Sequence, residues 1–415
     1  MGHKPFIFIL LLFFFSGQAF SQVPGCTDPQ ATNYNPEAVI NDGSCLYPNT
    51  SIHPETVVNP LPESVNETSG LIYWNGGLWT HNDSGNEAVL YKLDTITGQI
   101  LQTISITGAV NIDWEDIAQD DMHIYIGDFG NNEGNRTDLR IYKTAKADYP
   151  QIGDGSVPVS LIEFSYGDQT SFSRENRSND YDCEALISFN DSLFIFTKNW
   201  VNQQTRLYGM PVQPGVYTLN PVATFNTDGL ITGADMIADG SEIVLCGYKN
   251  YNPFIWLLYD FQGSNFFGGN KRRINFSGML GTQTEGASYT YGKNVYISCE
   301  KTMINAARLF RLSTAPWTDL LPTDAGGSIP ANQDIRLYPN PGQGTFRLQM
   351  NTECSDGLFT ADLFSCFGQQ VLSGQPVVFS ECTAGLQLPP LNDGLYFLRI
   401  SSAESTHTAK LMVGR

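Results

Sequence analysis

A strand pair that recurs five times along the middle of the chain constrains its fold most strongly. In the clearest copy, residues 113–118 are followed by a short polar turn and by the alternating segment 123–128. Alternating apolar and polar residues on both sides of a short turn predict two antiparallel strands. Equivalent pairs return with first segments that begin near Ser69, Cys183, Gly233 and Thr284, and in every copy the two segments lie 13–15 residues apart.

A third strand-like segment follows each pair, and a more variable fourth segment comes after it. The third segments are 89–93, 139–142, 206–208, 255–259 and 308–312, and fourth segments include 100–106, 159–166, 217–225 and 272–276. Units of four short strands that repeat about every 40–50 residues are typical of a β-propeller, in which small sheets surround a central channel. We therefore predict an all-β chain in which residues 50–322 form a β-propeller.

The number of first segments favours five blades. Six blades would require the long polar segment 144–180 to contain one more. The last unit, residues 284–321, has only three strong strands. We expect residues 55–61, which precede the first unit, to pair with that last unit, because this pairing closes the ring and removes an exposed edge.

The first 21 residues have the features of a secretory signal peptide. Lys4 supplies a positive end, residues 6–15 form an unbroken apolar run, and residues 19–21 offer a cleavage site. The apolar run is well short of the ~20 residues that a membrane-spanning helix needs. We therefore expect a mature chain that is exported and has no transmembrane segment.

The excess of acidic over basic residues limits which classes of partner are favourable. The chain has 23 basic and 42 acidic residues, which gives a formal net charge of −19. Nucleic acids and anionic membrane surfaces are disfavoured as partners because they would be repelled. A bound cation is easier to accommodate, although acidity can also serve only to keep an exported protein soluble.

Residues 22–48 form a small segment bracketed by Cys26 and Cys45. A segment of this size buries almost no core, so a disulfide between these cysteines is the expected staple, contributing about 3 kcal/mol by the loop-entropy argument. The eight cysteines of the chain belong in an oxidising compartment. Within the propeller, Cys246 and Cys299 could pair, or they could remain buried thiols, as could Cys183.

The bracketed segment also carries oxygen donors. The motifs at 26–29, 33–36 and 42–45 resemble a cysteine-bracketed module of exported Bacteroidota proteins, which is itself similar to the thrombospondin type 3 calcium repeat. The resemblance implies a calcium site, and the closely spaced donors are hard oxygen ligands. Alternatively, these side chains only form turns. The candidate ligands are Asp28, Asn33, Asn35 and Asp42.

A Gly- and Pro-containing linker, residues 323–334, precedes a last domain at 335–415. Its short alternating strands predict a small β-sandwich. The segment resembles the type A C-terminal sorting domain of the type IX secretion system, which implies the type IX machinery as a partner, export across the outer membrane, and surface attachment or release. The matching motif residues are Pro339, Asn340, Pro341, Gly344, Phe346, Gly368, Gly394, Tyr396 and Lys410.

Carboxylates are concentrated in the first segments of the repeat, whose ends open on one face of a propeller. Such a ring would repel itself unless it were protonated or neutralised by a cation. We therefore expect calcium or another hard metal near the channel, or else carboxylates that accept backbone amides and hold the ring together. The metal candidates are Glu115, Glu184 and Glu285 from first segments, with Asp83, Asp128 and Glu300 from second segments.

Three functional hypotheses follow. The chain is an exported or cell-surface propeller that binds an unidentified extracellular ligand, it is a metal-dependent hydrolase, or it is a purely structural scaffold displayed on the surface. The motifs at 69–71, 114–118 and 285–288 are loosely similar to esterase-like phytase propellers, which implies action on phosphate esters. The sequence has no G-x-S-x-G elbow, H-E-x-x-H helix or P-loop. Whether the protein is catalytic stays open at this point.

Overall fold

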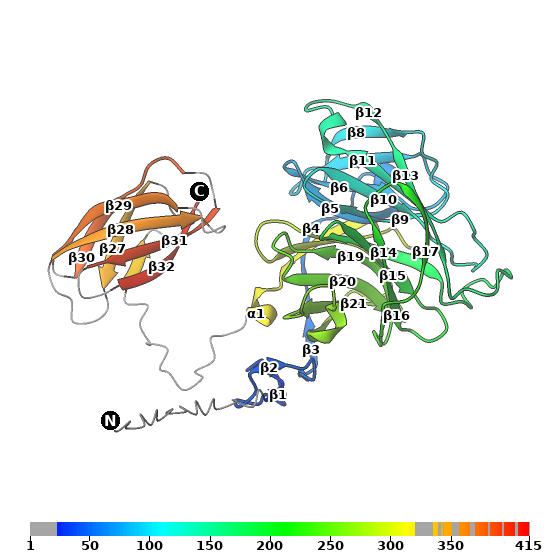
Figure 1. Ribbon diagram of the computed structural model, residues 1–415. Coiled ribbons are helices and arrows are strands. Elements are labelled where there is room, and N and C mark those ends of the chain that lie inside the picture. The colour runs from blue at the N-terminus through cyan, green and yellow to red at the C-terminus, as the bar shows by residue number, and fades with distance from the viewer. Residues whose placement is uncertain are drawn as a thin grey trace, which may run out of the picture. The chain divides into compact units, whose positions relative to one another are not determined.

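The computed structural model describes residues 23–319 and, near the C-terminus, residues 335–338, 342, 344–350, 357–365, 370–380, 382–391, 394–402 and 406–414. The chain divides into two units, residues 1–321 and 322–415. The described parts of both are built almost entirely of β-strands (Figure 1), which confirms the all-β class. The expected signal peptide (1–21) and linker (323–334) lie outside the described residues.

Five sheets of four or five strands make up most of the first unit, and each corresponds to one copy of the repeat. The first sheet contains β5 (Thr68–Trp74), β6 (Gly77–Asn82), β7 (Val89–Leu93), β8 (Ile100–Thr107) and β12 (Gly155–Pro158). The second contains β9 (Trp114–Gln119), β10 (His123–Asp128), β11 (Arg140–Ala145), β13 (Ser160–Tyr166) and β17 (Gly215–Leu219).

The other three sheets follow the same order. The third contains β14 (Asp182–Phe189), β15 (Ser192–Lys198), β16 (Thr205–Pro211) and β18 (Ala223–Phe225). The fourth contains β19 (Leu230–Met236), β20 (Glu242–Lys249), β21 (Asn252–Tyr259), β22 (Asn270–Phe276) and β3 (Thr50–Ile52). The fifth contains β23 (Thr284–Tyr289), β24 (Asn294–Cys299), β25 (Arg308–Ser313) and β4 (Glu55–Val58). Short helical turns are η1 (Glu63–Val65), η2 (Lys146–Asp148), η3 (Phe266–Gly268) and α1 (Ala315–Thr318).

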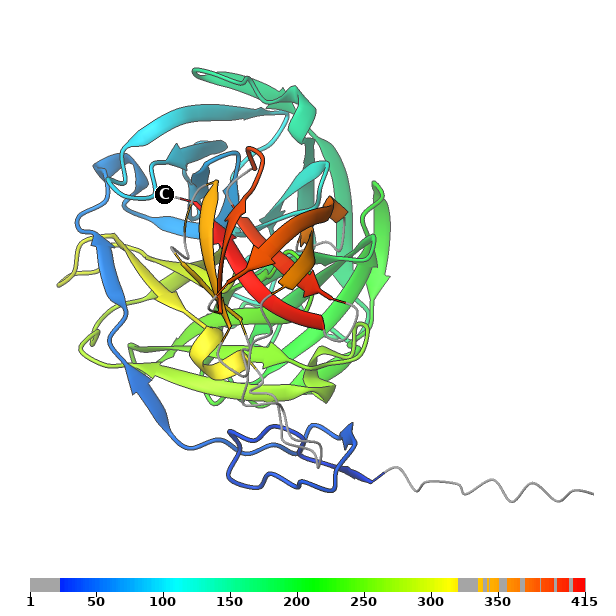
Figure 2. The same ribbon diagram turned by 90° about the vertical axis from the view of Figure 1, so that its left-hand side faces the viewer.

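Two expectations about strand pairing can be compared with this topology. Strand β4 pairs antiparallel with β25, so the N-terminal segment supplies the outer strand of the last sheet, as predicted. The long segment 144–180 forms no sheet of its own: β12 pairs parallel with β8 of the first sheet, and β13 pairs antiparallel with β11 of the second. Figure 2 shows the blue β3–β4 segment running beside the yellow-green and yellow sheets that it joins.

The five first strands, β5, β9, β14, β19 and β23, lie against one another in sequence order, and β23 also contacts β5. Three glycines permit this close approach. A Cβ atom on Gly70 would lie 2.5 Å from the backbone nitrogen of Ile117. On Gly233 or Gly286, it would lie 2.4 or 2.5 Å from a carbonyl oxygen of the neighbouring first strand. Only glycine leaves room for backbones this close together.

A separate hydrophobic cluster fills each gap between neighbouring sheets. Because successive side chains of a strand point to opposite faces, one first strand contributes to two clusters. In β14, Cys183 and Leu186 pack toward the second sheet, whereas Ala185 and Ile187 pack toward the fourth. Cys183, Cys246 and Cys299 are buried free thiols, so the second alternative considered for them holds.

The cysteine-bracketed segment is joined by the predicted disulfide, with Cys26 and Cys45 sulfurs 2.02 Å apart. Its short strands β1 (Pro24–Gly25) and β2 (Ile40–Asn41) pair in parallel. The segment packs on the fourth sheet: Lys271 donates a hydrogen bond to the Gly43 carbonyl at 3.1 Å, and Arg272 donates one to Gln30 at 2.6 Å. It therefore belongs to the first unit rather than standing apart as a separate module.

The described residues of the second unit form two antiparallel sheets around one core. One contains β26 (Ile335–Tyr338), β27 (Thr345–Met350) and β30 (Thr383–Gln387). The other contains β28 (Gly357–Ser365), β29 (Gln370–Phe379), β31 (Gly394–Ser401) and β32 (Thr406–Val413). Leu348 and Leu386 from the first sheet share a buried cluster with Leu363, Leu398 and Leu411 from the second.

Candidate functional site

Carboxylates gather where the first strands begin. Because the first and second strands of each sheet are antiparallel, the start of one lies beside the end of the other. Asp113 immediately precedes β9, whose second residue is Glu115, while Asp83 immediately follows β6. Glu285 is the second residue of β23, and Glu300 immediately follows β24. The fold thus concentrates negative charge at one end of the first strands.

The tightest group is formed by Asp83, Asp113 and Glu115, whose carboxylates each offer one oxygen within 4.8 Å of the others. The backbone N–H of Ser84 donates to Asp83. Among the described residues, no hydrogen bond or ion pair reaches the carboxylate of Asp113 or Glu115. Glu115 is only 7% exposed. We call these three residues the acidic triad, and it has oxygen atoms free to bind a cation.

Electrostatics in the acidic triad disfavour three bare negative charges. Burial, followed by the nearby carboxylates of Asp83 and Asp182, raises the pKa of Asp113 to about 7. Burial and then the charge of Glu184 raise the pKa of Glu115 well above its ordinary value. Burial also raises the pKa of Asp83. Near neutral pH the triad must therefore hold protons or a cation.

Glu184, a predicted metal ligand, has a cationic partner in the structure. Lys198 at the end of β15 places its Nζ atom 2.8 Å from Glu184 Oε1, and both side chains are buried. The Nζ atom also lies 4.9 Å from the ring centroid of Trp200. Burial alone would lower the pKa of Lys198, but attraction to Glu184 outweighs it and the pKa is raised. Lys198 is therefore charged and neutralises part of the cluster.

Glu285 and Glu300 form a second pair beside the acidic triad. The side-chain amide of Gln283 donates to both, at 3.2 Å and 2.5 Å. Burial raises the pKa of Glu285 to about 8, and burial together with Asp83 raises that of Glu300 to about 7. This pair is therefore anchored by a side-chain amide, and its raised pKa values mean that two further bare charges beside the acidic triad are disfavoured.

Asp128, also a metal candidate, is engaged elsewhere. One of its oxygens accepts the backbone N–H of Asp113 at 3.0 Å and forms an ion pair with Arg136 at 3.0 Å. The carboxylate thus fixes the loop that carries Asp113. It lies outside the acidic triad.

Two other carboxylates brace the first strands, which was the alternative interpretation of this acidic column. Asp116 in β9 accepts backbone N–H groups from Leu186 of β14 at 2.8 Å and from Ala234 of β19 at 3.1 Å. Asp235 in β19 accepts the N–H of Tyr289 of β23 at 2.8 Å. Asp116 and Asp235 therefore link neighbouring first strands, whereas other carboxylates of the same region form the acidic triad.

The side chains predicted to bind calcium in the bracketed segment accept hydrogen bonds from the protein itself. Asn33, Asn35 and Asp42 each accept a backbone N–H group through a side-chain oxygen. Asp28 is fully buried, and its Oδ2 atom accepts hydroxyl groups from Tyr47 at 2.7 Å and Tyr259 at 2.8 Å. These contacts are the ones expected if the side chains stabilise turns and hold the segment on the fourth sheet.

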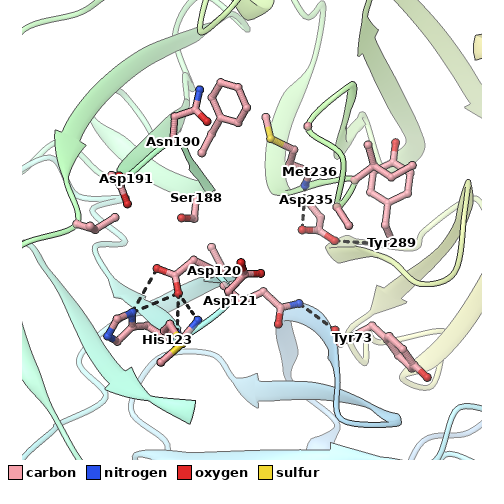
Figure 3. Close-up of a pocket in the computed structure, with 18 of the residues that line it drawn as sticks. Tyr73, Asp120, Asp121, His123, Ser188, Asn190, Asp191, Asp235, Met236 and Tyr289 are labelled. Carbon is pink, nitrogen blue, oxygen red and sulfur yellow. Dashed lines mark hydrogen bonds and ion pairs between the residues drawn. The ribbon is translucent and has the colours of Figure 1, made fainter. Parts of the chain in front are cut away.

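A cavity of about 930 Å³ opens at the opposite ends of the first strands (Figure 3). Gln119, Phe189, Met236 and Tyr289, which end β9, β14, β19 and β23, all line it. The sequence repeat gave no sign of this cavity, because its walls come from turns whose sequences differ from one copy to the next. Asp113 was also missing from the predicted ligands, although it lies only two residues before Glu115.

In the second unit, the described sorting-motif residues occupy strands or their edges. Phe346 in β27 is buried, Tyr396 in β31 is 9% exposed, and Gly394 begins β31. Gly344 lies just before β27, and Lys410 lies in β32. Pro339, Asn340, Pro341 and Gly368 lie outside the described residues.

Residues 336–414 match the family described as the secretion system C-terminal sorting domain. This match supports export of the chain as cargo of the type IX secretion system, and it implies a secreted or outer-membrane surface-attached protein. In the described part of the chain, no helix has the length and apolar character required to cross a membrane.

Other similarities are short or distant. A 40-residue stretch is 58% identical to ribulose bisphosphate carboxylase/oxygenase activase 1 of Larrea tridentata, and it covers 8% of this chain and 8% of that protein. Hydrazine synthase of Kuenenia stuttgartiensis matches with 10% identity over 70% of this chain and 75% of its own, with a TM-score of 0.30. U3-55K matches with 8% identity over 62% of this chain and 100% of its own, with a TM-score of 0.34. Likenesses of this size carry no argument about fold or function.

Proposed function

We propose that residues 50–322 form a five-bladed β-propeller, with a β-sandwich sorting domain behind it. Three observations support this arrangement: five sheets in sequence order, first strands that contact one another around to β5, and the N-terminal strand β4 paired with the last sheet. Five blades are favoured over six because segment 144–180 adds strands to existing sheets.

We infer that the acidic triad binds calcium or another hard divalent cation. The observation that carries this inference is the convergence of Asp83, Asp113 and Glu115, two of which have no donor among the described residues. Carboxylate oxygens are the ligands that calcium prefers. Glu184, whose charge Lys198 offsets, and Glu285 and Glu300, which Gln283 contacts, are proposed to surround the cation site rather than to supply its first ligands. A cation with three protein ligands retains coordination positions for an incoming group.

We infer from this that the protein is an exported, cell-surface binding protein whose extracellular ligand contacts the bound cation. Calcium titration of the exported chain by calorimetry tests the cation site. We expect one site per chain, lost in Glu115→Gln and retained in Glu37→Gln, a matched change at an exposed position of the bracketed segment. Equal calcium binding by both variants would refute a site at the acidic triad.

The alternative is a metal-dependent hydrolase of phosphate esters. Lys198 favours it, because this buried, charged ammonium group lies beside the acidic triad and could attract an anionic substrate. A metal ion would also activate a water molecule as the nucleophile. Assays with p-nitrophenyl phosphate and phytate, with and without calcium, distinguish the alternatives. Calcium-dependent turnover that is lost in Glu115→Gln would establish the hydrolase, whereas calcium binding without turnover would leave the binding function.

A further inference from the structure

The cavity at the opposite ends of the first strands is large enough for a small organic ligand. Its volume of about 930 Å³ falls within the ~300–1,000 Å³ range of small-molecule sites. It is separate from the acidic triad: Glu115 lies near the start of β9, Gln119 of the cavity ends the same strand, and Asp116 braces the strands between them. A ligand here would bind independently of the proposed cation.

Charge in the cavity is unbalanced in favour of carboxylates. Five aspartates line it, whereas Lys143 and Lys146 are its two lysines. Both ammonium groups already donate to the protein, Lys143 to the Val212 carbonyl at 3.0 Å and Lys146 to the Asp120 carbonyl at 2.6 Å. Both ammonium groups are therefore already hydrogen-bonded to the residues that line the cavity. The five aspartates are Asp120, Asp121, Asp191, Asp235 and Asp239.

Two of these aspartates are available to a ligand. Asp121, in the turn after β9, and Asp191, in the turn after β14, are both exposed. No hydrogen bond or ion pair involves either side chain among the described residues. Figure 3 shows Asp121, Asp191 and Asp235 on different sides of the cavity. A ligand that spans the cavity would meet hydrogen-bond acceptors from several sheets at once.

Aromatic rings complete the lining. The hydroxyl groups of Tyr73 and Tyr291 lie 3.1 Å apart, and their ring centroids lie 5.4 Å apart in an edge arrangement. Tyrosine faces attract organic cations, and hydrocarbon segments pack on them favourably. Carboxylates repel anions, whereas an ammonium group forms charge-assisted hydrogen bonds with them.

We propose that this cavity binds a small organic ligand with two or more ammonium groups, such as a polyamine. The carboxylates of Asp121 and Asp191 would each accept an ammonium group, and the tyrosine rings would pack against the intervening methylene groups. This assignment follows from the excess of acceptors, the engaged lysines and the cavity volume together. It does not depend on the proposed cation site or on the five-bladed arrangement.

Calorimetric titration of the exported chain with spermidine tests the proposal. We expect one site per chain and an affinity that falls about tenfold in the double variant Asp121→Asn/Asp191→Asn, because two ion pairs are lost. Both positions tolerate the change, since they are exposed and Asp191 has a φ of 56°, which asparagine adopts readily. Thermal melting of the double variant checks that it remains folded.

Two controls separate specific binding from general attraction to an acidic protein. Asp148→Asn removes one charge from an exposed position outside the cavity, and we expect spermidine to bind this variant as it binds the parent chain. Glu115→Gln should also leave spermidine binding unchanged. Absence of spermidine binding, equal weakening in Asp148→Asn, or tighter binding of a neutral trisaccharide than of spermidine would each overturn the proposal.

Discussion

Lys198 Nζ lies 2.8 Å from Glu184 Oε1, and both side chains are almost completely buried among other carboxylates. A buried ion pair of this kind contributes little relative to an apolar pair, but removing one partner leaves an uncompensated charge. The pair therefore divides the cluster into a neutralised part around Glu184 and the uncompensated acidic triad of Asp83, Asp113 and Glu115.

Replacing Lys198 by methionine should destabilise the protein strongly. The change leaves Glu184 buried without its cation, which costs about 3–5 kcal/mol in free energy of unfolding. Urea denaturation measures this difference. Lys249→Met is the matched control, because Lys249 pairs with Asp228 at a more exposed position, where such pairs contribute about 0–1 kcal/mol. Similar losses in the two variants would contradict the role given to Lys198.

The stability of the calcium-free protein should fall as the pH rises from about 5 to about 8. The folded-state pKa of Asp113, about 7, lies above its unfolded value of about 3.9, so the folded protein binds more protons within this interval. The free energy of unfolding that protonated Asp113 contributes at low pH is therefore lost as the pH rises through the folded-state pKa of Asp113. Urea denaturation across this range, repeated with Asp113→Asn, should show a smaller pH dependence in the variant.

Calcium should reverse that loss, because a bound cation replaces the protons of the acidic triad. We expect the increase in melting temperature on adding calcium to be larger at pH 8 than at pH 5, where protons compete for the same oxygens. An equal increase at both values would indicate binding to carboxylates with ordinary pKa values elsewhere on the surface.

Asp116→Ala should loosen the first strands. The substitution leaves the backbone N–H groups of Leu186 and Ala234 without their acceptor in a buried position, which costs about 2–5 kcal/mol for the two groups. Chemical denaturation gives the value, and hydrogen exchange should show faster opening of β14 and β19. Asp148→Ala, at an exposed position, should change the free energy of unfolding by less than about 0.5 kcal/mol.

Tyr259→Phe should release the bracketed segment without unfolding the five sheets. The change removes the 2.8 Å hydrogen bond that the Tyr259 hydroxyl donates to Asp28 and the 2.8 Å contact between the Tyr259 and Tyr47 hydroxyl oxygens, at a cost of about 1–3 kcal/mol. Hydrogen exchange should rise in residues 23–47 and remain unchanged in β14 and β15. Tyr34→Phe removes a hydroxyl from the same segment without cutting this contact, so its exchange should match that of the parent chain.

Much of the strand layout could be predicted from the sequence, because it depends on local patterns. Alternation of apolar and polar residues marked the strand pairs, and their recurrence along the chain predicted five sheets in sequence order. The Cys26–Cys45 disulfide followed from a segment too small to bury a core. The pairing of β4 with β25 was accessible because the last repeat lacked a strand and an unpaired strand edge is unfavourable.

The roles of individual carboxylates were decided by tertiary structure. Glu115 and Glu184 occupy equivalent places in the repeat, yet Lys198 on the adjacent strand neutralises only Glu184. Asp116 is the next residue after Glu115 but points to backbone amides of two other sheets. The repeat predicts which residues lie in the first strands. Their charges and partners depend on side chains from other strands and sheets, which a local sequence pattern does not reveal. The cavity beyond β9 and β14 arises in the same way, from turns that the fold brings together.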